Sequence, residues 1–369
     1  MKDFSNLKVA LVCDWLVGIG GAERVLLALH QLFPQAPIYT SQYDPKAIDW
    51  FHDADVRTSW LQHIPKGLRK FLPLLRAMSF SHLDLSDYDL VISSSGAEAK
   101  AVKTDSTTIH ICYCHSPTQY YWRRYEEYIK SPGFGYFDWL ARLGLKLFVK
   151  PMRYWDKRAA QKPDYLIVNS TFSRSEIKRC YGRDSKVIHP PVDTDSFKST
   201  DKNRSGFVTA GRQTPYKRTD LAVKACSKLG LDLVVIGDGP EHKKLQAMSG
   251  PTIKFILKVS DQERNNYFEA AEAFIFPVIE DFGIVAVEAL AAGTPVIAYK
   301  AGGALDYIVE SKNGLFFPKQ TVTSLVQVLK TFRNHTFNHE FIRQQAKQFD
   351  TKNFVDHFTE FINSVDNIE

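Results

Sequence analysis

Two glutamates eight positions apart, Glu280 and Glu288, are the side chains of this sequence best spaced to do chemistry. The apolar stretch 273–277 predicts a strand, residues 283–292 predict a helix, and 295–299 predicts the next strand. Glu280 would then lie just after a strand, and Glu288 within the following helix. Two carboxylates that converge in this way suit the hydroxyl groups of a sugar or a ribose.

A strand, a loop, a helix and a second strand form the repeating unit of a parallel α/β sheet, and ligands bind such sheets at the carboxyl ends of the strands. The pattern occurs in both halves of the chain. The sequence therefore predicts an α/β protein with two Rossmann-like, doubly wound domains that face each other across a cleft. The strands are expected at 7–13, 37–43, 88–94, 109–117 and 165–170 in the first half, and at 207–212, 233–240, 253–260, 273–277 and 295–299 in the second.

The boundary between the two domains is marked by the paired prolines Pro190 and Pro191 and by a polar run that ends near Arg204. This composition is typical of a hinge. We expect a first domain at 1–190 and a second at 191–350, with helical sequence from about Ser324 to the end.

The first domain offers two candidate binding positions. Gly20 and Gly21 follow the first strand and open a helix, so they could aim helix N–H groups at an anion, although a simple tight turn is the alternative. His115 lies at the carboxyl end of the expected strand 109–117, where a crevice forms. A histidine with a purely structural role is the alternative there.

Composition gives an ordinary globular profile, with 44% hydrophobic and 24% charged residues. Five scattered cysteines favour reduced thiols in the cytoplasm over a disulfide framework. We expect Cys112 and Cys114 to face opposite sides of a strand, without a metal site. The pairs Asp53 with Asp55 and Asp193 with Asp195 fall in expected loops, so no metal site is predicted. No apolar run is long enough to span a bilayer, and the N-terminus does not resemble a signal peptide.

The net charge of +6 is uneven, with +5 in residues 1–195 and +1 in the remainder. A basic half suggests a phosphate-bearing partner or an anionic membrane, and a solvated surface is the alternative. Residues 65–80 carry Lys66, Arg69, Lys70 and Arg76 among apolar side chains and are broken by Pro73. This stretch could lie on a membrane, or it could be a surface helix with its apolar face in the core.

Residues 119–162 are rich in aromatic and basic side chains and predict one or two helices. Such a mixture can bind lipid headgroups or nucleic acid. Because the segment matches no RNA-binding signature, nucleic acid is not expected as a partner. Further on, Ser173 with Glu176 three residues later predicts an N-terminal capping box for a helix.

Five segments of the second half together resemble the retaining family 4 glycosyltransferases of GT-B fold. They are GlyArg with TyrLysArg (211–218), ValIleGlyAspGlyPro (235–240), the run 276–289 around the two glutamates, GlyThrProValIleAla (293–298) and GlyGlyAlaLeuAsp (302–306). The resemblance covers nearly all of 205–318, and it extends more loosely to GlyGlyAlaGlu (20–23) and TyrCysHisSerPro (113–117). Within the family, the sequence is most similar to bacterial GDP-mannose-dependent mannosyltransferases.

This resemblance implies an enzyme that moves a hexose, expected to be mannose from GDP-mannose, to a glycan or a polyprenyl-diphosphate-linked glycan in cell-surface polysaccharide synthesis. The first domain would bind the acceptor and the second the nucleotide sugar, and the C-terminal helix at about 351–369 would pack back on the first domain. No metal or other cofactor is expected. The protein would act in the cytoplasm, at the inner face of an anionic membrane.

The family's roles carry over to matching positions of this sequence. Arg212 and Lys217 would stabilise the departing diphosphate, since arginine offers a two-pronged donor and lysine a point charge; a surface ion pair is the alternative for Arg212. Glu280 would hold the donor sugar, His115 would reach that sugar from the first domain, and Glu288 would hold the ribose. The donor-binding residues would be Gly20, Gly21, Lys258, Val259, Asp281, Phe282, Gly283, Ile284 and Glu288.

Three alternatives stay open at this point. The donor could be a UDP-sugar, or the enzyme could be a nucleotide-sugar 2-epimerase that shares the fold. The third alternative is a non-catalytic subunit that binds a nucleotide sugar, although such a protein is expected to have lost Arg212, Lys217 or a glutamate, and all are present.

Overall fold

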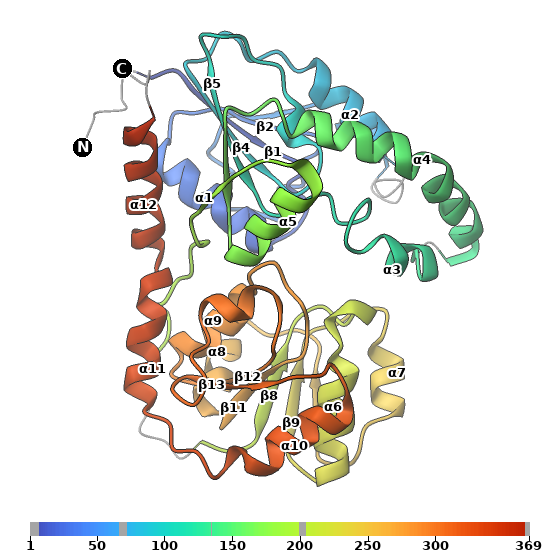
Figure 1. The fold of residues 1–369 in the computed structure, drawn as a ribbon, viewed down its shortest axis with the longest axis vertical. Helices are drawn as coiled ribbons and strands as arrows, with labels where there is room; N and C mark the ends of the chain where they lie inside the picture. The colour runs from blue at the N-terminus through green and yellow to red at the C-terminus, as the bar shows by residue number, and fades with distance from the viewer. Residues whose placement is uncertain (1–6, 66–71, 134, 199–203, 366–369) are drawn as a thin grey trace. The chain divides into compact units, whose positions relative to one another are not determined.

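The structure is a computed structural model, and it describes residues 7–65, 72–133, 135–198 and 204–365 (Figure 1). The chain divides into two compact units. Unit 1 comprises residues 1–191 and 354–369, and unit 2 comprises residues 192–353. Each unit is built around one parallel sheet with helices on both faces, so the predicted α/β class with two Rossmann-like domains is confirmed.

Unit 1 holds a seven-stranded sheet with the order β3-β2-β1-β4-β5-β6-β7. The chain runs outward from β1 to β3 and then returns to the other side of β1, so the switch in direction lies between β1 and β4. The pairs Leu11 with Ile92 and Ile92 with Ile111 fix the register of the central strands. The strands are β1 (Val9–Cys13), β2 (Ile38–Thr40), β3 (Val56–Thr58), β4 (Leu90–Ser95), β5 (Ile109–Cys114), β6 (Tyr165–Val168) and β7 (Lys186–Val187).

Helices cover both faces of this sheet because alternate strand residues point to opposite sides. Leu11 and Ile92 pack against α1 and α12, whereas Val12 and Val91 pack against α2 and α4. Farther along that second face, Val168 packs against α5. The helices are α1 (Gly21–Leu32), α2 (Pro73–His82), α3 (Tyr125–Lys130), α4 (Asp138–Ala159), α5 (Thr171–Tyr181) and α12 (Thr351–Ser364).

The last helix, α12, joins unit 1 from Phe354 onward. Phe354, Phe358 and Ile362 are buried in the same core cluster as α1 and the central strands. Their spacing of four residues places all three on one helix face. The Phe354 ring also lies 5.9 Å from the ring of Tyr113 on β5.

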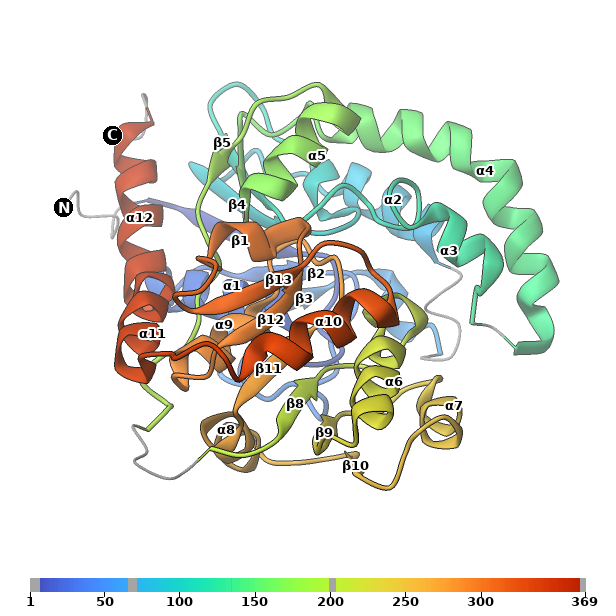
Figure 2. The ribbon, with the colours of Figure 1, turned by 60° about the horizontal axis from the view of Figure 1, so that its bottom comes forward.

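Unit 2 holds a six-stranded sheet with the order β10-β9-β8-β11-β12-β13, and its switch in direction lies between β8 and β11 (Figure 2). Helices α6, α7 and α10 cover one face, and α8, α9 and α11 cover the other. The strands are β8 (Phe207–Ala210), β9 (Leu233–Ile236), β10 (Ile253–Ile256), β11 (Ala273–Phe276), β12 (Val296–Tyr299) and β13 (Gly314–Phe317). The helices are α6 (Thr219–Leu229), α7 (His242–Ala247), α8 (Asp261–Ala270), α9 (Ile284–Ala291), α10 (Val322–Phe332) and α11 (His339–Ala346).

The cap of α5 differs from the prediction. Ser170, not Ser173, is the N-cap residue, and its Oγ accepts a hydrogen bond of 3.0 Å from the backbone N–H of Ser173. The helix starts three residues earlier than the capping-box pattern suggested, so Ser173 lies in its first turn. There the Ser173 hydroxyl donates to Asn169 Oδ1 at 2.6 Å.

The two neighbouring cysteines also differ from the prediction. Cys112 and Cys114 point to the same face of β5, because residues two apart on a strand share a side. Both are buried in the cluster that α5 covers. All five cysteines are buried and free. In the described part of the chain, no three His, Cys, Asp or Glu side chains gather in a way that could hold a metal ion.

The basic stretch 65–80 is only partly described, because Lys66, Arg69 and Lys70 lie outside the described residues. Pro73 does not break a helix but begins α2, a position where proline is well tolerated. Arg76 is buried and forms an ion pair of 2.9 Å with Glu98, so this cation does not face solvent. The apolar face of α2 lies in the core, which is the alternative arrangement considered from the sequence.

Candidate functional site

The predicted cations and one predicted glutamate meet at the switch point of unit 2. Arg212 and Lys217 follow β8, and Glu280 follows β11, the strand that pairs with β8. Both loops leave the carboxyl ends of their strands, where a doubly wound sheet opens a crevice. The sequence prediction that these side chains share one edge of the sheet therefore agrees with the topology.

Lys217 and Glu280 form an ion pair, with 2.7 Å between Lys217 Nζ and Glu280 Oε1. Their side chains are 22% and 18% exposed, so the pair is reachable from solvent but partly shielded by the protein. Within the described part of the chain, the exposed guanidinium of Arg212 has no carboxylate partner. The alternative of a surface ion pair for Arg212 is thus not found there. This edge of unit 2 presents a free cation beside an anchored one.

Glycines let the loop after β9 lie against the loop that carries Arg212. A Cβ added to Gly237, whose φ is 118°, would stand 2.3 Å from the carbonyl oxygen of Gly211. The backbone N–H of Gln213 donates to Asp238 O at 2.8 Å, which ties the two loops together. A larger residue at Gly237 would force the two loops apart. The contact therefore fixes the position of the loop that carries Arg212.

The loop after β12 supports Glu280 in the same way. Gly303 donates its backbone N–H to Glu280 O at 2.9 Å. A Cβ on Gly303 would come within 2.4 Å of Phe282 Cα, and one on Gly302 within 2.6 Å of Glu280 O. The glycine pair therefore allows two backbones to touch and holds the Glu280 carboxylate on a fixed loop.

The loop Asp281–Gly283 is anchored by a buried aromatic ring. The Phe282 ring lies 5.3 Å from the ring of Tyr307 and 5.6 Å from that of Phe349, and the Tyr307 hydroxyl donates to Phe282 O at 3.1 Å. Gly283 adopts a left-handed φ of 97° and caps α9, which begins at Ile284. These contacts fix the backbone N–H groups at the start of α9, which can face an anion.

Glu288 lies in α9 and is 5% exposed. Its Oε1 is 3.2 Å from Nη2 of Arg264, a residue of α8 that also pairs with Asp261 at 2.9 Å. The two predicted glutamates thus have different cationic neighbours. Sequence reasoning missed Arg264, although Ser260 with Glu263 forms a capping box that marks the start of α8.

The predicted residues Lys258 and Val259 follow β10, which is separated from β8 by β9. Lys258 is exposed, whereas Val259 is partly buried against the core. Both lie at the same edge of the sheet as Arg212, because all strands of unit 2 are parallel.

In unit 1, the corresponding switch point is filled by Asp14, which no sequence pattern singled out. Asp14 follows β1 and is 8% exposed. Its carboxylate accepts three backbone hydrogen bonds from the loop after β4, from Gly96 at 2.7 Å, Ala97 at 3.0 Å and Ala99 at 2.7 Å. These N–H groups form an anion-binding nest that the chain's own carboxylate occupies.

The predicted glycines of unit 1 lie at the start of α1, as the sequence indicated. Gly20 is the N-cap residue and Gly21 begins the helix. The Glu23 carboxylate lies close to this turn: a Cβ added to Gly20 would be only 2.9 Å from Glu23 Oε2. Burial, opposed by hydrogen bonds from backbone N–H groups and aided by the charge of Asp14, raises the pKa of Glu23 to about 7. Glu23, like Asp14, thus places its carboxyl group on backbone N–H groups that could bind an anion.

His115 directly follows β5, at the carboxyl edge where it was expected. Its Nε2 lies 2.8 Å from the Ser94 hydroxyl, and its ring centroid is 5.2 Å from that of Tyr113. Its carbonyl accepts a hydrogen bond from Asn169 Nδ2 at 3.1 Å. Burial lowers the pKa of His115 to about 4, so the imidazole is neutral at neutral pH. A neutral imidazole has one donor and one acceptor nitrogen, so it can form a hydrogen bond with a ligand hydroxyl while it keeps its contact with Ser94.

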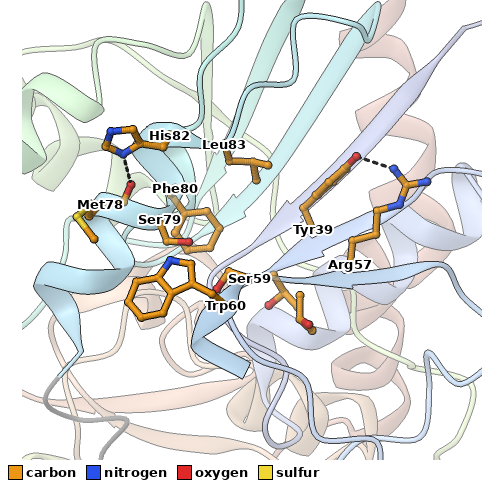
Figure 3. A pocket seen from close by; sticks show the side chains of 11 residues that line it. Tyr39, Arg57, Ser59, Trp60, Met78, Ser79, Phe80, His82 and Leu83 are labelled. Carbon is orange, nitrogen blue, oxygen red and sulfur yellow. Dashed lines mark hydrogen bonds between the residues drawn. The ribbon is translucent and has the colours of Figure 1, made fainter. Parts of the chain in front are cut away.

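Unit 1 also contains a pocket of about 460 Å³ that none of the predicted residues lines (Figure 3). Trp60 and Met78 lie at its mouth, and the Tyr39 hydroxyl accepts a hydrogen bond of 2.7 Å from Arg57 Nη1 on the opposite wall. Its lining is largely apolar and comes from β2, β3 and α2. The chain that links these walls includes residues 66–71, which lie outside the described residues.

Comparison with protein families assigns both halves of the chain. Residues 19–196 match the family model "Glycosyltransferase Family 4", and residues 192–349 match the model "Glycosyl transferases group 1". The two matches meet at the boundary between unit 1 and unit 2. The chain is a glycosyltransferase of the GT-B type.

Relatives of this glycosyltransferase are distant in sequence. The alpha-1,3/1,6-mannosyltransferase alg2 of Schizosaccharomyces pombe is 24% identical over 85% of this chain and 71% of that protein. A D-inositol 3-phosphate glycosyltransferase of a Nocardioides species is 28% identical over 43% of this chain and 44% of its own length. That second match spans less than half of the relative.

Solved structures share the whole fold of this glycosyltransferase. HepE of Anabaena, in complex with UDP and glucose, has a TM-score of 0.72 at 19% identity, covering 98% of this chain and 100% of that one. The lipopolysaccharide outer core galactosyltransferase WaaB has a TM-score of 0.67 at 16% identity, covering 97% and 99%. At such low identity, these matches support the fold alone.

Proposed function

We propose that this glycosyltransferase moves mannose from GDP-mannose, with retention of the anomeric configuration, to a glycan or lipid-linked glycan in bacterial cell-surface polysaccharide synthesis. The reaction would take place at the cytoplasmic face of the membrane. One observation carries the proposal: at the switch point of unit 2, the Lys217–Glu280 ion pair shares the edge of the sheet with Arg212, which has no carboxylate partner among the described residues.

The chemistry of transfer explains why these charges suit the site. As the bond from the sugar to the diphosphate breaks, negative charge grows on the diphosphate and the sugar becomes oxocarbenium-like. Arg212 and Lys217 would stabilise that charge more strongly in the transition state than in the ground state, which is the requirement for catalysis. Glu280 would keep the Lys217 ammonium in place with one carboxylate oxygen and accept a hydroxyl of the donor sugar with the other.

Retention would follow from attack on the same face that the diphosphate leaves, with the diphosphate itself taking the acceptor proton. No nucleophile of the enzyme is then required, and Glu280 serves to bind and orient. The two cations would also make a divalent metal unnecessary. Undiminished transfer in the presence of EDTA is the expected result, and loss of transfer that added Mg²⁺ restores would contradict this part of the proposal.

The remaining predicted residues would complete the donor site. The backbone N–H groups of Asp281, Phe282, Gly283 and Ile284 would bind phosphate and sugar oxygens, and Glu288 would hold the ribose. Lys258 and Val259 would lie near the base. The roles proposed for His115 and for Gly20 and Gly21 rest on the family resemblance.

The comparisons suggest two candidate donors. The similarity to the alg2 mannosyltransferase and to mannosyltransferase motifs favours GDP-mannose. The second candidate donor is a UDP-sugar, of the kind that HepE, which shares the fold, binds.

A thermal-shift panel of nucleotide sugars separates the two candidates, because a bound donor stabilises the folded chain by about 2.7 kcal/mol at a hundredfold excess over Kd. We expect GDP-mannose to raise the unfolding temperature more than UDP-glucose or UDP-galactose. The reverse order would establish the second candidate. Release of GDP only when an acceptor glycan is supplied would then identify transfer, whereas conversion of the nucleotide sugar to its epimer without any acceptor would indicate an epimerase.

A further inference from the structure

Helix α4 is the longest helix of the described chain, and only its second half is held by the core. Its buried residues are Val149, Met152, Asp156 and Ala159. The first half contains no buried residue and extends past the sheet of unit 1 together with α3 (Figures 1 and 2). A long helix with a free half needs an explanation when that half is apolar.

The outward side of α4 carries a row of large apolar side chains. Leu140, Leu143, Leu147 and Tyr154 are 45%, 48%, 62% and 66% exposed. Their spacing of three, four and seven residues places them on one side of the helix, opposite Met152 and Asp156. Together with Trp139, which is 60% exposed, they form what we call the α4 stripe.

Aromatic rings extend the stripe at its beginning. Tyr136 and Phe137, in the turn before α4, are 89% and 55% exposed. A contiguous apolar surface of this kind is uncommon on a soluble protein and marks an interaction site. Trp and Tyr side chains, with an apolar body and a polar tip, are enriched where proteins meet the interface of a bilayer.

Between its two ends, α4 itself carries cations and no acids. Residues 139–155 contain two lysines and two arginines but no aspartate or glutamate. Lys146 and Lys150 are exposed, lie one turn apart and form no ion pair with any described residue. Of the two acids at the ends of the helix, Asp138 pairs with Arg142, one of these four cations, and Asp156 pairs with the buried Lys100.

The stripe is presented on a rigid base. The Asp156 carboxylate is fully buried and accepts hydrogen bonds from Trp122 Nε1 and from the Tyr181 hydroxyl, each at 2.7 Å. Its other oxygen lies 2.8 Å from Lys100 Nζ. Because one end of α4 is fixed in this way, the free half can contact another surface while the helix stays folded.

We propose that the α4 stripe docks this protein on an anionic lipid bilayer, with α4 lying in the headgroup region parallel to the membrane plane. Apolar side chains on one side, lysines next to them and aromatic rings at one end form the pattern of an interfacial helix, and the cations complement anionic headgroups. This docking rests on the proposed function in so far as that function places the reaction at a membrane. The two fail separately, because vesicle binding is measured without donor or acceptor, and transfer to a soluble glycan is measured without vesicles.

Co-sedimentation of the full chain with vesicles tests the proposal. We expect binding to vesicles of phosphatidylcholine with phosphatidylglycerol, and weak binding to phosphatidylcholine alone. Replacing Lys146 and Lys150 by glutamine should weaken partition roughly 30-fold, since each cation near an anionic surface contributes about fivefold. The matched control is Lys224→Gln with Lys228→Gln, two exposed lysines one turn apart on α6.

The apolar contribution is tested by Leu143→Gln with Leu147→Gln, for which we expect loss of vesicle binding with an unchanged unfolding temperature, because both side chains are exposed. Equal sedimentation of all variants, or no sedimentation of the wild-type chain, would overturn the proposal. So would a dimer in vesicle-free gel filtration that these two changes abolish, because the stripe would then bind a second copy.

Quenching of tryptophan fluorescence by brominated lipid locates the contact. Trp139 belongs to the α4 stripe, whereas Trp60 lies at the pocket beside α2 (Figure 3). We expect Trp139→Phe to remove most of the quenching and Trp60→Phe to leave it. The opposite result would move the docking surface to α2 and contradict the proposal.

Discussion

The two sheets of this glycosyltransferase have the same strand order around their switch points, yet the two positions are filled in opposite ways. In unit 1, Asp14 and Glu23 place the chain's own carboxylates on backbone N–H groups that could otherwise bind an anion. In unit 2, the loops present the cations Arg212 and Lys217, and among the described residues Lys217 has a carboxylate partner whereas Arg212 has none. At the first switch point the chain's own acids meet the backbone N–H groups, whereas the second presents cations to an external anion.

This contrast shows that topology alone does not make a phosphate site. Both sheets offer a crevice at the carboxyl ends of their strands, as any doubly wound sheet does. What differs is whether the residue after the first strand is an acid that turns inward or a cation that stays exposed. An inward acid such as Asp14 stabilises the unit, whereas exposed Arg212 is left for a ligand.

The largest effect is expected for Glu280→Gln. The change removes the charge that holds Lys217 and weakens the contact to the donor sugar, so kcat should fall by about 100- to 1000-fold, the range for losing one electrostatic group aimed at the transition state. Nucleotide binding should largely survive. Steady-state kinetics and a nucleotide titration on the same protein would measure both quantities.

The matched control is Glu272→Gln, which removes a glutamate of unit 2 that pairs with Arg333 at 2.9 Å. We expect kcat to stay within about twofold of the wild-type value, because Glu272 precedes β11 and therefore lies at the opposite edge of the sheet from Glu280. Near-normal turnover of Glu280→Gln would show that the ion pair with Lys217 has no part in transfer.

The next effect concerns stability. Asp14→Asn would place an amide among three backbone N–H donors and remove the charge that strengthens those hydrogen bonds, so the free energy of unfolding should fall by about 3 kcal/mol. Urea denaturation measures this change. The affinity of the folded variant for GDP should be unaltered, and a loss of GDP affinity would mean that the switch point of unit 1 takes part in donor binding.

A smaller effect is expected from His110, which is fully buried on β5 beside Ser93. Burial lowers the pKa of His110 to about 3, so between pH 6.5 and 3 the unfolded chain binds a proton that the folded chain does not. Stability is therefore lost as the pH falls through this window, by about 2 kcal/mol from His110 between pH 7.5 and pH 5.

Urea denaturation at these two pH values would measure the loss. His110→Gln cannot be protonated, so we expect its stability to decrease by about 2 kcal/mol less than that of the wild-type chain over the same pH interval. Identical pH dependence of both proteins would show that His110 does not titrate between the folded and unfolded states.

Much of the fold could be predicted because its signals are local. The apolar runs that became β1, β4, β5, β11 and β12 are bounded by glycine, proline and polar residues, and their order implied parallel sheets. By contrast, β3 (Val56–Thr58) has only three residues, all at least partly exposed, and was not expected. Such a short edge strand is stabilised by pairing with β2, which no local pattern reveals.

The candidate site shows the same limit. Arg212, Lys217 and Glu280 could be chosen because each follows a strand, but the ion pair between Lys217 and Glu280 joins loops 63 residues apart and needs the fold. The partner of Glu288, Arg264, comes from a helix whose sequence is polar and carries no apolar periodicity. Asp14 could not be singled out from the sequence, because an acid after a strand gives the same sequence pattern whether its side chain turns inward or faces a ligand.

Titration of the protein with GDP tests the central claim most directly, namely that the switch point of unit 2 binds the donor diphosphate. Calorimetry on Arg212→Ala should show an affinity reduced by roughly 10- to 100-fold, the cost of losing a charged hydrogen-bond donor, whereas Arg333→Ala, on the same unit, should bind as the wild type does. Equal affinity of the wild-type chain and Arg212→Ala for GDP would contradict the claim.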